Sequence, residues 1–269
     1  MLIGIRAHDL PERDITSLSQ KLFKLGITEI QLALPKSIDN IDFSTGKFTP
    51  MLARNLKTEL SKNNISIAVL GCYINLSTED ESARNKEIDR FVENLKYAKY
   101  MNADMVGTET GGYSPEKIHS EEAYAVMLDS VKKMVSAAEK LGVRVGIEGV
   151  SAHPLSTPEK MYRLMNDIKS PNLAVIFDPV NLITPENYKE QHKITDKAFS
   201  LYGDKIEAIH LKDFDIKNGE KIEAKIFDGI FDHQYLIEKI KTEKPHLPIL
   251  LECESQETYP IVKEKLMGL

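Results

Sequence analysis

Short apolar runs alternate with amphipathic stretches from one end of the chain to the other. The apolar runs are nearly continuous Val, Ile, Leu and Ala, which is typical of parallel strands covered on both faces. Each run is followed by a polar loop and a stretch with the period of an α-helix. The expected strands are residues 2–7, 28–34, 66–73, 104–110, 144–150, 173–178, 206–213 and 248–254. The expected helices are residues 14–25, 48–63, 81–101, 120–141, 157–168, 190–202, 233–243 and 257–267.

This order of elements predicts the fold. Eight strand-helix units in about 250 residues have the size and order of an α/β (β/α)8 TIM barrel, with a doubly wound sheet as the lesser alternative. No Pro/Ser-rich or low-complexity stretch divides the chain, so we expect residues 1–269 to form a single TIM-barrel domain. The longer connections, 35–50 and 213–231, are expected to be loops at the rim of an active site.

Composition and charge narrow the classes of partner. The chain has 269 residues, of which 42% are apolar, and its formal net charge is -6, which argues against sequence-independent binding to nucleic acid. No apolar run approaches the ~18 residues of a membrane span, and Arg6 interrupts the start before a signal-peptide core could form. Cys72 and Cys253 have no C-x-x-C spacing and imply neither a disulfide framework nor a cysteine zinc site. We expect a cytoplasmic protein with a small-molecule substrate and no membrane or nucleic-acid partner.

Four polar residues lie near the ends of four successive strands. They are Glu148, Asp178, His210 and Glu252, separated by 30, 32 and 42 residues, or one strand-helix unit each time. In a TIM barrel these strand ends meet around one active site. A lone histidine in a strand is more often a core residue, but an acid after several apolar residues carries a large desolvation cost unless it is paired. Three carboxylates and one imidazole suit one divalent metal ion, such as Mn²⁺, Mg²⁺, Co²⁺ or Zn²⁺.

The same positions carry a resemblance to a known family. Glu148, the run Asp178-Pro179-Val180-Asn181, the run His210-Leu211-Lys212-Asp213 and Glu252 resemble the xylose-isomerase-like TIM barrel superfamily of sugar phosphate isomerases and epimerases. The ligand pattern is similar to that of ketose 3-epimerases, hydroxypyruvate isomerase and inosose isomerases and dehydratases. The resemblance implies that the four residues bind one divalent metal. It also implies that Glu148 and Glu252 face each other across the substrate as the proton-transferring pair.

The leading interpretation is a metal-dependent isomerase or epimerase of a small keto sugar or related polyol. Such an ion would polarise the carbonyl and stabilise an enediolate, while one carboxylate removes a proton and the other returns one. A lyase that dehydrates an inosose or a dehydroshikimate-like ring begins with the same proton abstraction and is the second interpretation. A non-catalytic sugar-binding protein is the third. The sequence does not determine the substrate, its phosphorylation or the metal. It also leaves the oligomeric state open, with a homo-oligomer as one of the alternatives.

Two positions differ from the ketose 3-epimerases. Those enzymes carry a His three residues after the metal Asp, where this chain has Asn181, and an Arg six residues after the metal His, where it has Ile216. The resemblance therefore does not select that subgroup. Class II apurinic endonucleases share the barrel, but the additional His ligands of their trinuclear zinc cluster are missing here.

Further polar residues near the strand ends are candidates for substrate binding. They are His8, Glu109, His153, Asn181 and Lys212. Arg6 and His8 share one face of the first strand and are expected at the floor of the site. Lys212 lies on the same face as His210, where it either binds a substrate oxygen or remains solvated. For His153 the alternative is a surface histidine.

Overall fold

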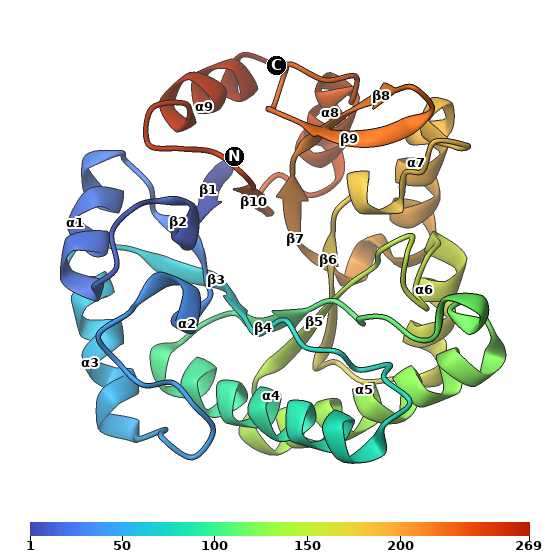
Figure 1. Ribbon diagram of the computed structural model, residues 1–269. Helices are drawn as coiled ribbons and strands as arrows, with labels where there is room; N and C mark the ends of the chain where they lie inside the picture. The colour runs from blue at the N-terminus through green and yellow to red at the C-terminus, as the bar shows by residue number, and fades with distance from the viewer.

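The eight predicted strands close into a parallel barrel in the computed structural model, which describes residues 1–269 (Figure 1). The barrel strands are β1 (Leu2–Arg6), β2 (Glu29–Leu32), β3 (Ser66–Gly71), β4 (Met105–Thr108), β5 (Arg144–Glu148), β6 (Leu173–Phe177), β7 (Ile206–Leu211) and β10 (Pro248–Leu251). Each strand pairs with its neighbour along the chain, and β10 closes the barrel against β1. The (β/α)8 fold is confirmed, whereas its extent as one domain over residues 1–269 stays a prediction.

Helices surround the barrel in a ring (Figure 1). They are α1 (Ile15–Lys24), α2 (Leu34–Ser37), α3 (Pro50–Ser61), α4 (Glu81–Met101), α5 (Glu121–Leu141), α6 (Pro158–Asp167), α7 (Gln191–Tyr202), α8 (His233–Glu243) and α9 (Tyr259–Gly268). Side chains cap several helices, as where Thr157 accepts a hydrogen bond from the Lys160 N–H at the start of α6. At the end of α5, Gly142 takes a left-handed φ of 69°, which favours glycine. No helix combines the length and apolar character that a membrane crossing requires.

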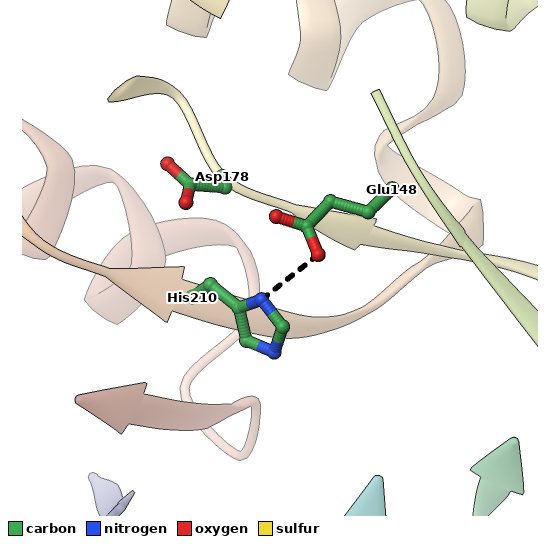
Figure 2. Close-up of side chains that lie close together, drawn as sticks. All are labelled: Glu148, Asp178 and His210. Atoms are coloured by element: carbon green, nitrogen blue, oxygen red, sulfur yellow. Dashed lines mark ion pairs between the residues drawn. The ribbon is translucent and has the colours of Figure 1, made fainter. Parts of the chain in front are cut away.

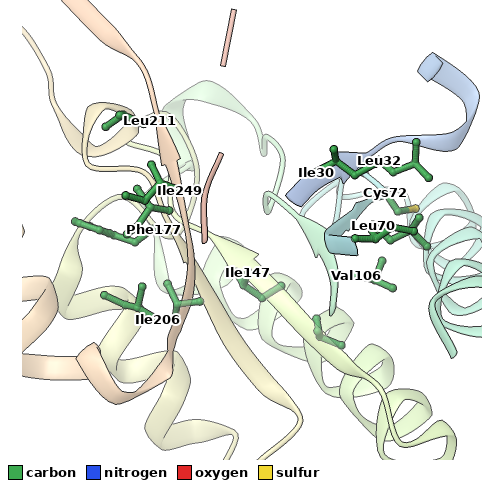
Figure 3. Packing of buried hydrophobic residues seen from close by; sticks show 14 of the residues in the cluster. Ile30, Leu32, Leu70, Cys72, Val106, Ile147, Phe177, Ile206, Leu211 and Ile249 are labelled. Atoms are coloured by element: carbon green, nitrogen blue, oxygen red, sulfur yellow. The ribbon is translucent and has the colours of Figure 1, made fainter. Parts of the chain in front are cut away.

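Strand alternation divides the apolar side chains into two groups. The larger group packs between the strands and the helices, and Figure 3 shows part of it, including Leu70 and Ile147. The smaller group fills the barrel interior with Ala68, Val69, Met105, Ile176, Ala208 and Leu250. Gly107 leaves room for this group, because a Cβ there would lie 2.5 Å from Val69.

The inward alternation also determines where the candidate ligands point. Asp178, His210 and Glu252 each lie two residues after an inward-facing residue of the smaller group, respectively Ile176, Ala208 and Leu250. Residues two apart on a strand share a face, so these side chains project into the mouth of the barrel. Because these residues all lie on the inward face of their strands, polar side chains from separate strand ends meet in one site.

The connection after β7 differs from the sequence expectation. Residues 213–231 were expected to be a loop, but they contain an antiparallel hairpin of β8 (Asp213–Lys217) and β9 (Glu220–Ala224). Asn218 and Gly219 form its two-residue turn with φ values of 53° and 82°. Asn-Gly is the preferred dipeptide for such a turn, so the local sequence carried the signal. The hairpin does form part of the predicted rim, because its side chains line the central cavity.

Candidate active site

Three of the predicted ligands meet in the barrel mouth. Ligand atoms of Glu148, Asp178 and His210 lie within 4.8 Å of one another. Figure 2 shows the ion pair between Glu148 on β5 and His210 on β7, with Asp178 nearby at the end of β6. The Nδ1 atom of His210 lies 3.0 Å from Oε2 of Glu148 and 3.2 Å from Oε1 of Glu252. The structure therefore brings all four residues together, with the imidazole between the two glutamates.

Several buried atoms of this group lack a hydrogen bond. Both ring nitrogens of His210 lack a hydrogen bond although the residue is 0% exposed, and Oδ2 of Asp178, which is 1% exposed, has only the ammonium of Lys212 beside it. His210 Nδ1 lies close to two carboxylates, whereas Nε2 has no polar partner to bond with. An unsatisfied buried polar atom costs ~1 to 3 kcal/mol. A divalent cation would satisfy these oxygen and nitrogen donors, so the residues fit a metal ion.

The electrostatics of the group are dominated by negative charge. Burial lowers the pKa of His210, but the carboxylates of Glu148 and Glu252 outweigh this effect and raise the pKa to about 9. Burial raises the pKa of Asp178 to about 6, against the opposing charge of Lys212. For Glu252, burial raises the pKa, yet His210 and Lys212 together hold it below its ordinary value. A site of this kind attracts a cation.

Two predicted substrate-binding residues contact the ligand group directly. The Nζ atom of Lys212 lies 2.8 Å from Oδ2 of Asp178 and donates to Oδ1 of Asn181 at 2.7 Å. Asn181 in turn donates from Nδ2 to Oε1 of Glu148 at 2.6 Å. The side chain of Lys212 is 18% exposed, so it is not the solvated lysine of the alternative interpretation. Both residues line the cavity while they orient the carboxylates behind them.

Sequence reasoning missed a second set of polar contacts. The Tyr73 hydroxyl donates to Oε2 of Glu148 over a long 3.5 Å, and Gln31 donates from Nε2 to that hydroxyl at 3.1 Å. Gln31 is a buried polar residue between the apolar Ile30 and Leu32 of β2, and a polar residue in this position was the signal in the sequence that could have indicated it. Tyr73 lies two residues after the end of β3. Its ring turns toward Glu148 on β5, and the sequence alone does not indicate this orientation.

A cavity of about 380 Å³ opens above the ligand group. Its lining includes Arg6, His8, Glu109, Asn181, Lys212 and Glu252 together with residues of the β8–β9 hairpin. Arg6 and His8 both line the cavity, but His8 lies in the short 3-10 helix Ala7–Asp9 and not on the first strand as expected. Their role in binding a substrate stays a prediction, and Arg6 also lies 3.2 Å from Oε2 of Glu252. Such a volume suits a small polar molecule.

Glu109 and His153 lie together on one side of this cavity. Burial and the charge of Glu148 raise the pKa of Glu109 to about 7, so the Glu109 carboxyl carries a proton for much of the time near neutral pH. His153 does not line the cavity, and its Nδ1 lies 3.8 Å from Oε2 of Glu109. Its role as a direct substrate contact stays a prediction, and its observed position is behind Glu109.

Comparisons with known proteins agree with this architecture. A family model described as xylose isomerase-like TIM barrel matches residues 20–266, whereas no curated protein sequence matches the chain. Among solved structures, D-psicose 3-epimerase in the presence of D-fructose is 16% identical with a TM-score of 0.70, covering 94% of this chain and 84% of that chain. The IolI protein with a bound zinc atom is 17% identical with a TM-score of 0.73, covering 99% and 96%.

A third similar structure is the probable 3-DHS dehydratase AsbF of Bacillus anthracis. It is 13% identical with a TM-score of 0.77, and the alignment covers 99% of both chains. At these identities the solved structures establish a shared fold. The family model covers nearly the whole chain, and this protein belongs to the xylose isomerase-like TIM barrel family.

Proposed function

We propose that this protein is a metal-dependent isomerase or epimerase of a small keto sugar or a related polyol. The observation that carries the proposal is a pair of glutamates, Glu148 and Glu252, on either side of the buried His210 Nδ1, with Glu252 lining the cavity above them. Two carboxylates beside one carbonyl can remove and return a proton. The similar structures include an epimerase, which supports a reaction of this class.

The proposed ligands are Glu148, Asp178, His210 and Glu252. A divalent ion held there would polarise the substrate carbonyl and stabilise the enediolate that forms when the α-proton leaves. Glu252 lines the cavity and is placed to accept the first proton or to return it. Glu148 performs the opposite step, with its carboxylate fixed by the amide of Asn181 and the hydroxyl of Tyr73.

A second candidate is a metal-dependent dehydratase that acts on an inosose or a dehydroshikimate-like ring. The observation that favours it is Glu109, whose pKa is raised to about 7 by burial and which faces the same cavity. A protonated carboxyl there can donate its proton to a leaving hydroxyl after a glutamate has removed the α-proton. An unsaturated product distinguishes this reaction from isomerisation, which returns a proton to carbon.

The experiment is a screen of ketoses, their phosphates and inososes in deuterium oxide with added Mn²⁺. Proton NMR follows the loss of the α-proton signal and the appearance of any alkene proton. With the substrate identified, Glu148→Gln and Glu252→Gln keep the side-chain shape but remove the base. Each should lower kcat by ~10² to 10⁴ at saturating metal.

The control is Glu220→Gln, because Glu220 is an exposed carboxylate on the same hairpin, at the start of β9, and does not line the cavity. Its kcat should stay close to that of the wild type. An epimer pair gives a finer signature, since one of the two active-site variants should exchange deuterium into one epimer without converting it. Near wild-type turnover by either metallated Gln variant would show that the base lies elsewhere, with Lys212 and His153 the next candidates.

A further inference from the structure

Lys212 places an ammonium group inside the proposed metal-ligand set. Its Nζ lies 2.8 Å from Oδ2 of Asp178 and 3.4 Å from Oε2 of Glu252, and it donates to Oδ1 of Asn181. Asp178 itself is 1% exposed, and no other lysine or arginine forms an ion pair with it. Arg6 is a second cation beside the set, and it contacts Glu252 at 3.2 Å from the end of β1.

We propose that Lys212 is a built-in counter-ion that a divalent metal must displace, and that metal binding thereby moves this ammonium into the substrate cavity. The inference rests on the metal site of the proposed function. Buried carboxylates are costly unless a positive charge accompanies them, and Lys212 supplies that charge to Asp178. A divalent ion bound by Asp178 and Glu252 would lie within a few ångströms of Nζ, where like charges repel strongly. Ion and ammonium therefore compete for the same two carboxylates.

The cavity gives the displaced ammonium a place to go. Lys212 already lines the cavity, and its flexible four-carbon stem allows Nζ to move without a change in the backbone. Glu109 also lines this cavity, and the charge of Lys212 lowers the pKa of its carboxyl against the larger effect of burial. An ammonium in this position would donate hydrogen bonds to substrate oxygens. Metal loading would thus complete the substrate site as well as the metal site.

The test compares Lys212→Met with the wild type by calorimetric titration of Mn²⁺ and by thermal unfolding with and without a chelator. Methionine keeps the length of the apolar stem but removes the charge. We expect Mn²⁺ to bind at least ~10-fold more tightly to Lys212→Met, because its competitor is gone. In chelator the same variant should unfold at a lower temperature than the wild type, because Asp178 has lost its counter-ion. Once the substrate is known, KM at saturating Mn²⁺ should rise.

Lys221→Met is the matched control. Lys221 lines the same cavity, but its Nζ donates to the backbone oxygens of Val180 and Ile183 and forms no ion pair with the ligand group. Removing it should leave the affinity for Mn²⁺ unchanged. Circular dichroism verifies the fold, and Lys212→Gln replaces the methionine variant if that variant does not fold.

The outcomes separate this inference from the proposed function. Equal or weaker Mn²⁺ binding by a folded Lys212 variant, with normal binding by the wild type, overturns the counter-ion role and leaves the metal site standing. If Mn²⁺ binds to the Lys212 variant but not to the wild type, the result supports displacement most strongly, because Lys212 then prevents the metal from binding. Absence of binding to both chains overturns the counter-ion role and the metal-dependent function together.

Discussion

Asp213 anchors the segment that forms one wall of the cavity, and Asp213→Asn should destabilise the protein markedly. The carboxylate is 1% exposed. Its Oδ1 accepts hydrogen bonds from the N–H groups of Phe214 at 2.7 Å and Phe231 at 3.0 Å. Its Oδ2 accepts from those of Phe227 at 3.0 Å and Gly229 at 3.1 Å. Asparagine keeps the shape but places an NH₂ group against one pair of these donors.

The magnitude follows from the two donors that lose their acceptor. A hydrogen bond to a charged group contributes ~1.5 to 3 kcal/mol, so losing two should lower the free energy of unfolding by about 3 to 6 kcal/mol. At ~2 to 4 °C per kcal/mol for a chain of this size, Tm should fall by about 10 °C. Phe227 adds to the cost, because its φ of 73° is held by the bond to Asp213.

Calorimetry and urea unfolding measure this effect, with Asp215→Asn as the control. Asp215 lies two residues further along the same hairpin strand, its side chain is 30% exposed, and it accepts a hydrogen bond only from the Ile216 N–H. The control should lose less than ~1 kcal/mol. If Asp213→Asn were no less stable than Asp215→Asn, the four-bond anchor would not hold the segment and the reasoning would be wrong.

Three further substitutions test a proposed metal ligand, the positioning of a proposed catalytic base, and a half-buried carboxyl group at the end of the barrel opposite the site. His210→Asn should weaken Mn²⁺ binding by at least ~10-fold in calorimetry, and rising Mn²⁺ should partly restore its activity. Tyr73→Phe removes the donor to Glu148, so steady-state kinetics should show kcat about tenfold lower with KM nearly unchanged. Burial and the charge of Asp104 raise the pKa of Glu29 from 4.5 to about 7, so the folded chain holds a proton that the unfolded chain releases. The Glu29 contribution to wild-type stability should therefore fall by on the order of 1 kcal/mol as pH rises through that range, after allowance for partial solvent exposure, and urea unfolding should show a fall smaller by about that amount for Glu29→Gln.

The barrel and the positions of the four candidate ligands were predictable because both depend on local patterns. Buried parallel strands need a continuous apolar sequence, so the places where each apolar run begins and ends indicate the approximate limits of the strand. A polar residue at the end of such a strand is conspicuous, and strand parity decides that it points inward. Glu148, Asp178, His210 and Glu252 satisfy both conditions, which is why the expectation and the observed convergence agree.

The positions of the side chains around those ligands depend on contacts that sequence spacing does not encode. Alternation places Lys212 on the same face as His210, but its long stem reaches either solvent or Asp178, and the charge of the assembled carboxylates decides between them. The hydrogen bond from Tyr73 to Glu148 joins residues 75 positions apart. His153 lies behind Glu109 because the loop after β5 turns away from the cavity.

Substrate selectivity is the feature that is hardest to predict from the sequence, because contacts between segments far apart in the chain position the cavity wall. The β8–β9 hairpin is held at its base by Asp213, and Lys221 ties β9 to the loop after β6 through the oxygens of Val180 and Ile183. The wall residues Ile222 and Glu223 lie next to that second anchor, so their position depends on a contact between segments nearly 40 residues apart. Changes at Ile222 or Glu223 should therefore alter which substrate binds while leaving the ligand group intact, whereas changes at Asp213 should disturb the whole wall.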